Sequence, residues 1–249
     1  MPPSTTAVLA RVDTARTNRF LAALPLNDFS LLAPHLRIVE LTRGVDLHEA
    51  GEPIEHVYFP HTGMVSVVTI MRNGATVETA SLGRTGVIGA GAGFGGRRGI
   101  GRAIVQLPGT ASRMPAARFH AAAQESAAIR ELAVRYNDLL IAQIQQSVAC
   151  NALHTLEARL CRWLLQTHDC VGGDTIPLTQ EFLGQMLGVR RTSVTLAARL
   201  LQSAGLIRYR RGHIQVVDRA ALEDAACECY AAIQEHTDEV FPAAAAAAG

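Results

Sequence analysis

Lysine is absent from this sequence of 249 residues, and all 23 basic residues are arginines. This absence excludes the Schiff-base chemistry of a lysine amine and the phosphate-binding loop that requires a lysine. The 22 acidic residues nearly balance the arginines, so the net charge is only +1. A surface that attracts a polyanion must therefore come from an uneven distribution of arginine along the chain.

Long apolar segments are also missing. No run approaches the ~20 apolar residues that a membrane-spanning helix requires. The N-terminal stretch "MPPSTTAVLARVDTARTNRF" lacks the basic start and the long apolar core of a secretory signal. We therefore expect a cytoplasmic protein without a membrane partner.

Cysteine is missing from the first 149 residues. The cysteines that follow are odd in number in a chain without an export signal, which indicates reduced thiols. In "CEC" a single residue separates the two thiols, which is too tight for the usual two-residue spacing of a zinc knuckle. We expect ordinary thiols, with redox sensing as the alternative, and no metal site. The five are Cys150, Cys161, Cys170, Cys227 and Cys229.

Glycine and proline are distributed unevenly. Glycine is missing between residues 110 and 171, and proline between residues 116 and 176, whereas 14 of the 21 glycines lie between residues 44 and 109. The glycine-rich region is predicted to be turn-rich, and the region after it helical. Short β-branched runs separated by turn signals, such as "RNG" at residues 72–74, predict the strands of a sandwich or rolled barrel.

A long helix is predicted to start at Ser126, which is suited to cap it. The apolar period changes there to 3.6 residues, and a stripe of about heptad spacing continues for ~20 residues. A helix of this length exceeds what one small core can cover, so the stripe favours a dimer seam. The alternative is a helix that packs within its own chain. The residues assigned to the seam are Ile129, Leu132, Tyr136, Leu140 and Gln143.

Two short helices are predicted in "LTQEFLGQMLGVRRTSVTLAARLLQ", residues 178–202. Thr179 can cap the first helix, and Gly188 supplies the left-handed backbone of a tight turn. Together with the apolar positions, this spacing is typical of a helix-turn-helix. The segment "LIRYRRGHIQVV" then predicts two strands joined at Arg211–Gly212, which makes the motif winged.

Charge is asymmetric around this motif. Residues 178–217 carry six arginines and one acid, whereas residues 218–239 carry seven acids and one arginine. A basic module of this kind suits the phosphates of double-stranded DNA; the alternative is that the arginines only cover a solvated face. The predicted DNA-contacting residues are Arg190, Arg191, Thr192, Ser193, Thr195, Thr179, Arg210, Arg211 and His213.

These features resemble the Crp/Fnr family of bacterial transcription regulators over nearly the whole chain. "FLGQMLGVRRTSVTLAARLLQSAGLI" aligns without gaps with the family's DNA-reading segment, and Ile88–Gly89 and Phe94 match its cyclic-nucleotide cassette. The resemblance implies an α+β fold and a homodimer on a pseudo-palindromic site, with RNA polymerase as a further partner to consider. The implied segments are an N-terminal β-roll domain with its preceding helices (1–124), a dimerisation helix (125–150), a winged helix-turn-helix (151–240) and an alanine-rich tail (241–249).

The cassette departs from the pattern of family members that bind cyclic AMP. The glutamate that contacts the ribose is replaced by Ala90, and no nearby arginine is followed by Ser or Thr. The base-facing Thr–Ser pair of the dimer helix becomes Ile144–Gln145. Cyclic AMP binding in the usual mode is therefore not expected, and the effector, if there is one, is an unidentified small molecule. The alternative function is a β-roll that senses another nucleotide or an anion, with DNA binding secondary. The candidate pocket residues are Arg97, Arg98, Arg102, Ala90, Ile144 and Gln145.

The family's reading-helix pattern R-E-x-x-x-R becomes Arg191, Thr192 and Leu196. Arg191 keeps the position that the resemblance implies for bidentate contact with guanine. The chain lacks the family's carboxylate and second arginine, so we expect a different half-site. No Ser-His-Asp, zinc or Walker signature is found, and an enzyme is not expected.

Overall fold

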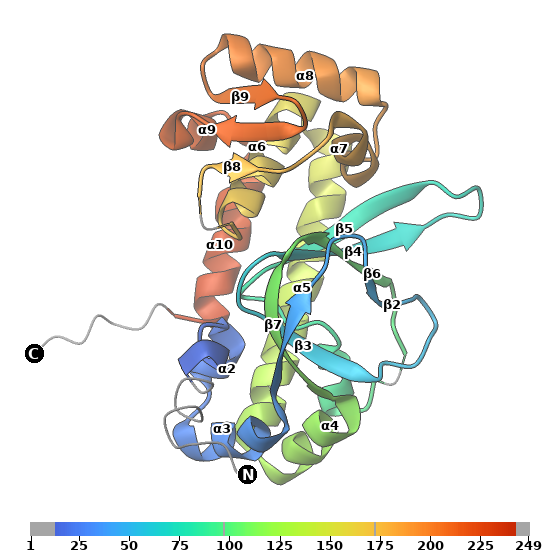
Figure 1. Ribbon diagram of the computed structural model, residues 1–249, viewed down its shortest axis with the longest axis vertical. Coiled ribbons are helices and arrows are strands. Elements are labelled where there is room, and N and C mark those ends of the chain that lie inside the picture. The colour runs from blue at the N-terminus through green and yellow to red at the C-terminus, as the bar shows by residue number, and fades with distance from the viewer. Residues whose placement is uncertain (1–12, 97, 172, 243–249) are drawn as a thin grey trace, which may run out of the picture. The chain divides into compact units, whose positions relative to one another are not determined.

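The computed structural model of the protein describes residues 13–96, 98–171 and 173–242 (Figure 1). The chain divides into two compact units. Among the described residues, the first, called here the β-roll unit, comprises 13–65, 82–96, 98–140 and 236–242, and the second, called the helix-turn-helix unit, comprises 66–81, 141–171 and 173–235. The long helix that the sequence predicts contributes residues to both units.

Antiparallel strands form the framework of the β-roll unit. β1 (Arg37–Leu41) pairs with β7 (Gly109–Pro115), and β7 pairs on its other side with β3 (His56–Pro60). A second sheet has the strand order β2-β6-β4-β5. The predicted β-roll is confirmed. The strands of the second sheet are β2 (Asp46–His48), β4 (Met64–Ile70), β5 (Thr76–Leu82) and β6 (Arg102–Leu107).

Two glycines of the roll occupy positions that a side chain could not share. Gly63 has φ +81°, and a Cβ atom there would lie 2.6 Å from the carbonyl oxygen of Leu107. At Gly109 a Cβ atom would lie 2.2 Å from the carbonyl oxygen of Thr62. The glycine-rich composition of this region therefore reflects close backbone approach as well as tight turns.

An aromatic cluster forms the core of the β-roll unit. The ring of Phe20 lies 5.7 Å from that of Phe59 and 6.1 Å from that of Phe119, measured between centroids. Tyr136 and Phe241 extend the cluster. Phe20 and Phe119 lie on the helices α2 (Arg19–Ala23) and α4 (Ala116–Glu125), so their rings join these helices to the roll. Helix α3 (Leu26–Leu32) adds Phe29 and Leu32 to the same apolar core, and short 3-10 turns lie at Ala33–His35 and Ala90–Phe94.

Helix α5 (Ala127–Leu153) is as long as predicted, but its buried side is not a dimer seam. Ile129, Leu132 and Tyr136 belong to the core of the β-roll unit and are 0%, 7% and 2% exposed. Leu140 is half-buried, and Gln143 donates a hydrogen bond to the carbonyl oxygen of Ser81 at 3.2 Å. The assignment of the first three to a seam is wrong, because a side chain in its own subunit's core has no surface left for a partner. The alternative, packing within the chain, holds for them.

The helix-turn-helix unit is built on α6 (Leu156–His168), whose first turn is capped by Thr155. Leu160, Trp163 and Leu164 of this helix are essentially fully buried. A small sheet of order β8-β10-β9 stands beside the helices. The other elements are β8 (Thr175–Ile176), α7 (Gln180–Leu187), α8 (Arg191–Ser203), β9 (Ile207–Arg210), β10 (His213–Val216), α9 (Arg219–Asp224) and α10 (Cys229–Val240), the last of which runs on into the β-roll unit.

Among the residues that the structure describes, no helix is both long and apolar enough to cross a bilayer.

Candidate nucleic-acid interface

The turn between α7 and α8 depends on two glycines. Gly188 ends α7 with φ +66°, the left-handed conformation predicted for it. A Cβ atom at Gly184 would lie 2.9 Å from the carbonyl oxygen of Val189, so the helices can cross closely only because this residue has no side chain. Thr179 caps α7 by accepting from the backbone N–H of Phe182 at 3.3 Å, as predicted.

Helix α8 has one buried and one exposed face. Val194, Ala197 and Leu201 are buried, and α8 packs on α6 and α7. Because helical residues three and four apart share a face, the remaining positions form a continuous exposed stripe. That stripe consists of Arg191, Thr192, Leu196, Arg199 and Leu200.

The two adjacent arginines differ in backbone setting. Arg190 precedes the helix as its N-cap residue, with an extended backbone and no side-chain cap hydrogen bond, whereas Arg191 is the first helical residue. Both side chains are exposed. The first turn of α8 therefore presents one arginine from the helix and one from the turn before it.

Thr195 does not fit the DNA-contacting role predicted for it. Its hydroxyl donates to Oε1 of Gln180 at 2.7 Å and to the carbonyl oxygen of Arg191 at 3.0 Å. The hydroxyl therefore links α8 to α7. Its neighbour Ser193 is half-buried.

The wing is a tight hairpin in which His213 lies opposite Arg210. Its two turn residues, Arg211 and Gly212, have φ of +49° and +78°. Arg211 is the one non-glycine residue with positive φ in the described part of the chain, a strained conformation for an arginine. This backbone geometry places an arginine at the tip of the wing. Arg210, Arg211 and His213 are all exposed, as a contact role requires.

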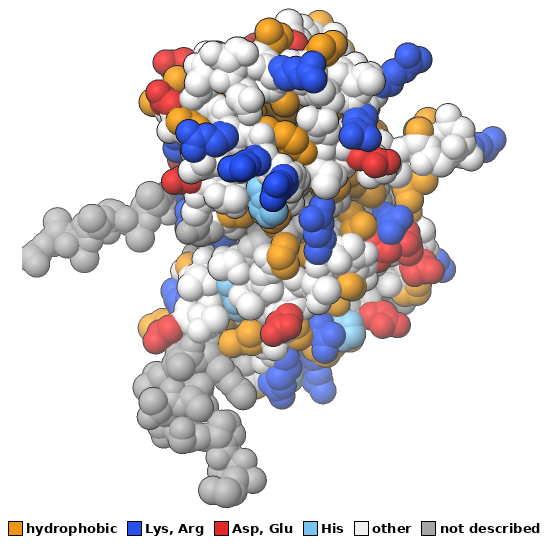
Figure 2. Space-filling model, turned by 45° about the horizontal axis from the view of Figure 1, so that its top comes forward, with side chains coloured by type: hydrophobic (Ala, Val, Ile, Leu, Met, Phe, Trp, Pro, Cys, Tyr) orange, Lys and Arg blue, Asp and Glu red, His pale blue; other side chains and the backbone are white. Residues whose placement is uncertain are grey.

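Arginine side chains gather on the surface that carries α8 and the wing (Figure 2). Two exposed arginines of this surface, Arg199 and Arg208, were counted in the charge balance but not assigned as contacts. Helical spacing could have identified Arg199, because it lies on the same face as Leu196. Arg208 could be identified as a candidate contact only from the strand pairing, which places it opposite Gln215 in the wing.

A buried carboxylate lies beneath the helix-turn-helix. Glu78 of β5 accepts hydrogen bonds from the hydroxyls of Ser66 and Ser81 and, at 2.7 Å, from Nε1 of Trp163. Burial raises the pKa of Glu78 above its ordinary value, against the opposing effect of these hydrogen bonds and of the Arg162 charge. We therefore expect the stability of this unit to depend on the ionisation of Glu78.

We expect Glu78→Gln to change how stability depends on pH. Since the folded-state pKa is raised, the contribution of Glu78 to the free energy of unfolding is fully present below its ordinary pKa of about 4.3. That contribution is lost as pH rises through the raised pKa. Glutamine keeps a hydrogen-bond acceptor but never ionises. The stability of the Glu78→Gln variant, relative to the unmodified protein, should therefore increase with pH. Urea-unfolding midpoints across a pH series measure the difference; the exposed Glu235→Gln is the control, and parallel curves would contradict the assignment.

Three of the residues predicted to line a ligand pocket, Ala90, Arg98 and Arg102, lie in the described part of the β-roll unit. Ala90 is 5% exposed and belongs to the core of the β-roll unit. Arg102 makes two hydrogen bonds with the carboxylate of Asp46, at 2.7 and 2.6 Å, so its charge is already paired. Arg98 donates to the carbonyl oxygen of Gly51 at 2.6 Å. Arg97 lies outside the described residues, and Ile144 and Gln145 belong to the helix-turn-helix unit.

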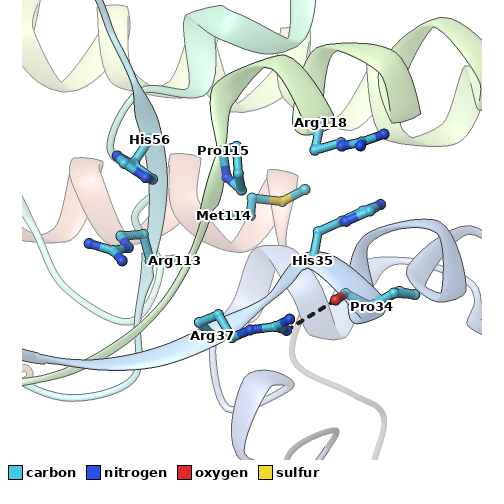
Figure 3. Close-up of a pocket in the computed structure, with 8 residues that line it drawn as sticks. All are labelled: Pro34, His35, Arg37, His56, Arg113, Met114, Pro115 and Arg118. Atoms are coloured by element: carbon cyan, nitrogen blue, oxygen red, sulfur yellow. Dashed lines mark hydrogen bonds between the residues drawn. The ribbon is translucent and has the colours of Figure 1, made fainter.

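A basic hollow exists elsewhere on the β-roll unit, with a volume of about 230 Å³ (Figure 3). Arg37 at its edge donates to the carbonyl oxygen of Pro34 at 3.0 Å. Partial burial and the charge of Arg113 lower the pKa of His56. None of the lining side chains is acidic, so the hollow suits an anion. It is lined by Pro34, His35, Arg37, His56, Arg113, Met114, Pro115 and Arg118.

A β-roll followed by a winged helix-turn-helix defines a class of two-part regulators. A family model described as a cyclic nucleotide-binding domain matches residues 38–126, and one described as a Crp-like helix-turn-helix domain matches residues 158–225. Together the two matches span more than half of the sequence. The chain belongs to the Crp/Fnr family of transcription regulators.

Solved structures share this fold. FixK2 from Bradyrhizobium japonicum is 17% identical, with a TM-score of 0.66 over 77% of this chain and 98% of that one. A transcriptional regulator of the CRP family from Thermus thermophilus is 22% identical, with a TM-score of 0.60 over 76% and 96%. The c-di-GMP responsive regulator CLP of Xanthomonas campestris is 14% identical, with a TM-score of 0.60 over 78% and 100%. No curated protein gives a significant match in sequence.

Proposed function

We propose that the protein is a homodimeric regulator that recognises a specific pseudo-palindromic DNA sequence. The observation that carries the proposal is the exposed stripe of α8, with Arg191 in its first turn, next to a wing that holds Arg211 at its tip. A helix fits the major groove, and an arginine at its start can donate two hydrogen bonds to a guanine. The exposed arginines of the wing suit the adjacent phosphates. No catalytic role is part of the proposal.

The base contacts are expected to differ from those of family members with a second arginine in the reading helix. Leu196 stands in that arginine's place and is 61% exposed. An exposed leucine on this face suits the methyl group of thymine, because apolar side chains contact that group in the major groove. Thr192 beside it can donate or accept a hydrogen bond. We therefore expect each half-site to contain a guanine that Arg191 contacts and a thymine whose methyl group lies near Leu196.

The dimer seam is reassigned to the exposed side of α5. Val134, Ile141 and Val148 are 43%, 46% and 64% exposed and recur every seven residues. Heptad spacing places them along one face of the helix, the pattern by which two helices pair. A second copy of this chain is the partner that fits, since the same stripe on both copies is self-complementary around a twofold axis.

The β-roll unit has a sensing role in this proposal, but cyclic AMP in the family's usual mode is not its ligand. Ala90 offers no carboxylate for a ribose, and Arg102 is paired with Asp46. The hollow beside Arg37, Arg113 and Arg118 is a better place for an anionic effector. An anion there would meet several arginines, and no acidic side chain lines the hollow, although the carboxylate of Glu55 acts electrostatically on His56.

The proposal is tested by selecting sites from a randomised pool of duplex DNA and measuring binding by fluorescence anisotropy. We expect enrichment of inverted repeats with half-sites about one helical turn apart. The affinity should fall steeply with salt, by about 0.9 logarithmic units per tenfold salt for each phosphate contacted. Cyclic AMP should leave the affinity unchanged. Failure to enrich any sequence, or loss of the salt dependence, would reject DNA reading; a large gain with cyclic AMP would reject only the assignment of the ligand.

A further inference from the structure

Three of the five cysteines and one histidine meet within the helix-turn-helix unit. Cys150 lies in the last turn of α5, and His154 directly follows that helix. Cys229 is the first residue of α10, and Cys227, which is 77 residues from Cys150, shortly precedes it. Their potential ligand atoms, three sulfurs and one ring nitrogen, all lie within 4.8 Å of one another. The sequence suggested unconnected thiols, because "CEC" alone is too closely spaced for a zinc knuckle.

The separations match a tetrahedral site. Sγ of Cys150 lies 3.5 Å from Sγ of Cys227, and Sγ of Cys229 lies 3.5 Å from Nδ1 of His154. With zinc–sulfur and zinc–nitrogen bonds of about 2.3 and 2.0 Å, the ligand atoms of a tetrahedron lie about 3.5–3.8 Å apart. One ion can therefore be bound by all four groups with small movements of the side chains.

The groups around the cluster orient its members. Nε2 of His154 lies 3.1 Å from a carboxylate oxygen of Glu228, which leaves Nδ1 directed toward the sulfurs. Metal-bound histidines commonly have such a carboxylate partner on their second nitrogen. Gln146 donates its amide N–H to the sulfur of Cys229 at 3.0 Å. These contacts hold both ligands in the orientation that a metal requires.

Burial and charge also suit a metal. Cys150, Cys227 and Cys229 are 0%, 7% and 0% exposed, so thiolates here would be unfavourable without a cation. Three thiolates and a neutral imidazole around a dication leave one net negative charge. Arg159 and Arg162 act electrostatically on Cys150 and can compensate that charge.

We propose that Cys150, His154, Cys227 and Cys229 bind one zinc ion in a closed Cys₃His site. Four protein ligands leave no open position, which is the arrangement of structural rather than catalytic zinc. Tetrahedral coordination by sulfur and nitrogen ligands is typical of zinc. The ion would fasten the start of α10 to the end of α5. The proposal does not depend on which DNA sequence the protein reads.

A disulfide between Cys150 and Cys227 is the competing explanation, since their sulfurs are 3.5 Å apart. It would use two of the four groups and give no role to the convergence of Cys229, His154 and Glu228. The zinc site uses all four groups as ligands, and Glu228 orients His154 among them. The two explanations also differ in their response to reducing agents and chelators, which makes them separable by experiment.

The test begins with the full chain purified under reducing conditions without chelator. We expect about one zinc per chain by mass spectrometry of the metal, and cobalt exchange should give the visible bands of a tetrahedral thiolate site. A chelator should lower the thermal unfolding midpoint, and zinc but not magnesium should restore it. This arm uses the unmodified chain and needs no variant to fold. Absence of zinc and cobalt binding would overturn the proposal, and recovery of a Cys150–Cys227 disulfide by peptide mapping of a sample prepared without reductant would establish the competing explanation.

Matched cysteine variants localise the metal. Cys229→Ser should lower the zinc content at least tenfold, whereas Cys161→Ser and Cys170→Ser, in the same unit but outside the cluster, should retain it. Glu228→Gln leaves the four ligands intact and should weaken zinc binding by about 10- to 100-fold. Equal zinc content in Cys229→Ser and the controls would overturn the assignment of the site.

Discussion

Ile141→Glu is expected to weaken binding to a full pseudo-palindromic site by at least about 100-fold, because the loss of a second binding module removes an avidity of roughly 10²–10⁴. Ile141 is the centre of the stripe assigned to the dimer seam, and it is 46% exposed in the subunit. A glutamate there leaves the subunit's own core intact. Around a twofold axis it would face its own copy, and two like charges would be buried without partners.

The measurement pairs sedimentation velocity with anisotropy on full and half sites. The variant should sediment as a monomer and bind both sites with the same low affinity. Ala149→Glu is the matched control, because Ala149 is exposed on the same helix but is turned by about 100° from its neighbour Val148. A variant that remains a dimer would refute this seam, whereas a control that dissociates would show that α5 is sensitive to charge at any exposed position.

Arg191→Ala is expected to cost about 1–3 kcal/mol in binding, roughly a 5- to 150-fold loss of affinity, and to relax the preference at one base pair of each half-site. The side chain is exposed at the first turn of α8, where the N-terminal residues of a reading helix meet base edges. A bidentate arginine distinguishes guanine from the other bases by its two acceptors. Its removal should therefore affect specificity as well as affinity.

Arg190→Ala separates base reading from charge. Arg190 precedes the helix and has an extended backbone, so we assign it to a phosphate. Its removal should weaken binding evenly across sequences and reduce the salt slope by about 1. Competition assays with all single-base changes in the selected site measure both effects. If Arg190→Ala altered one base preference and Arg191→Ala altered none, the two roles would be reversed.

The cysteine cluster connects stability to the reading unit. A zinc ion at Cys150 and Cys229 would fix the segment that follows the wing, whereas Glu78 belongs to a separate hydrogen-bond network around Trp163. The two groups share no hydrogen bond, but the charge of Arg162 acts on both Glu78 and Cys150, so chelation and pH should act mainly on different parts of the same unit. A Glu78→Gln variant would keep its response to chelator, and a Cys229→Ser variant would keep its response to pH.

The sequence by itself determined the features that local chemistry dictates. Thr179 caps α7, Gly188 takes the left-handed turn, and Arg211–Gly212 forms the tight wing, because the backbone at each position favours few residue types. The excess of arginine over acidic residues between residues 178 and 217 is also visible in the sequence alone. These signals are short in range, and they were sufficient for the helix-turn-helix and its wing.

Only the tertiary structure decided which face of a helix meets which neighbour. The periodicity of α5 fits two stripes, and which of them is buried depends on what packs against the helix: Tyr136 packs in the aromatic core of the β-roll unit, whereas Ile141 is 46% exposed. The same reason applies to Thr195, whose hydroxyl is taken by Gln180. It applies most strongly to Cys150 and Cys227, because no local pattern indicates that residues so distant in sequence will place their sulfurs 3.5 Å apart.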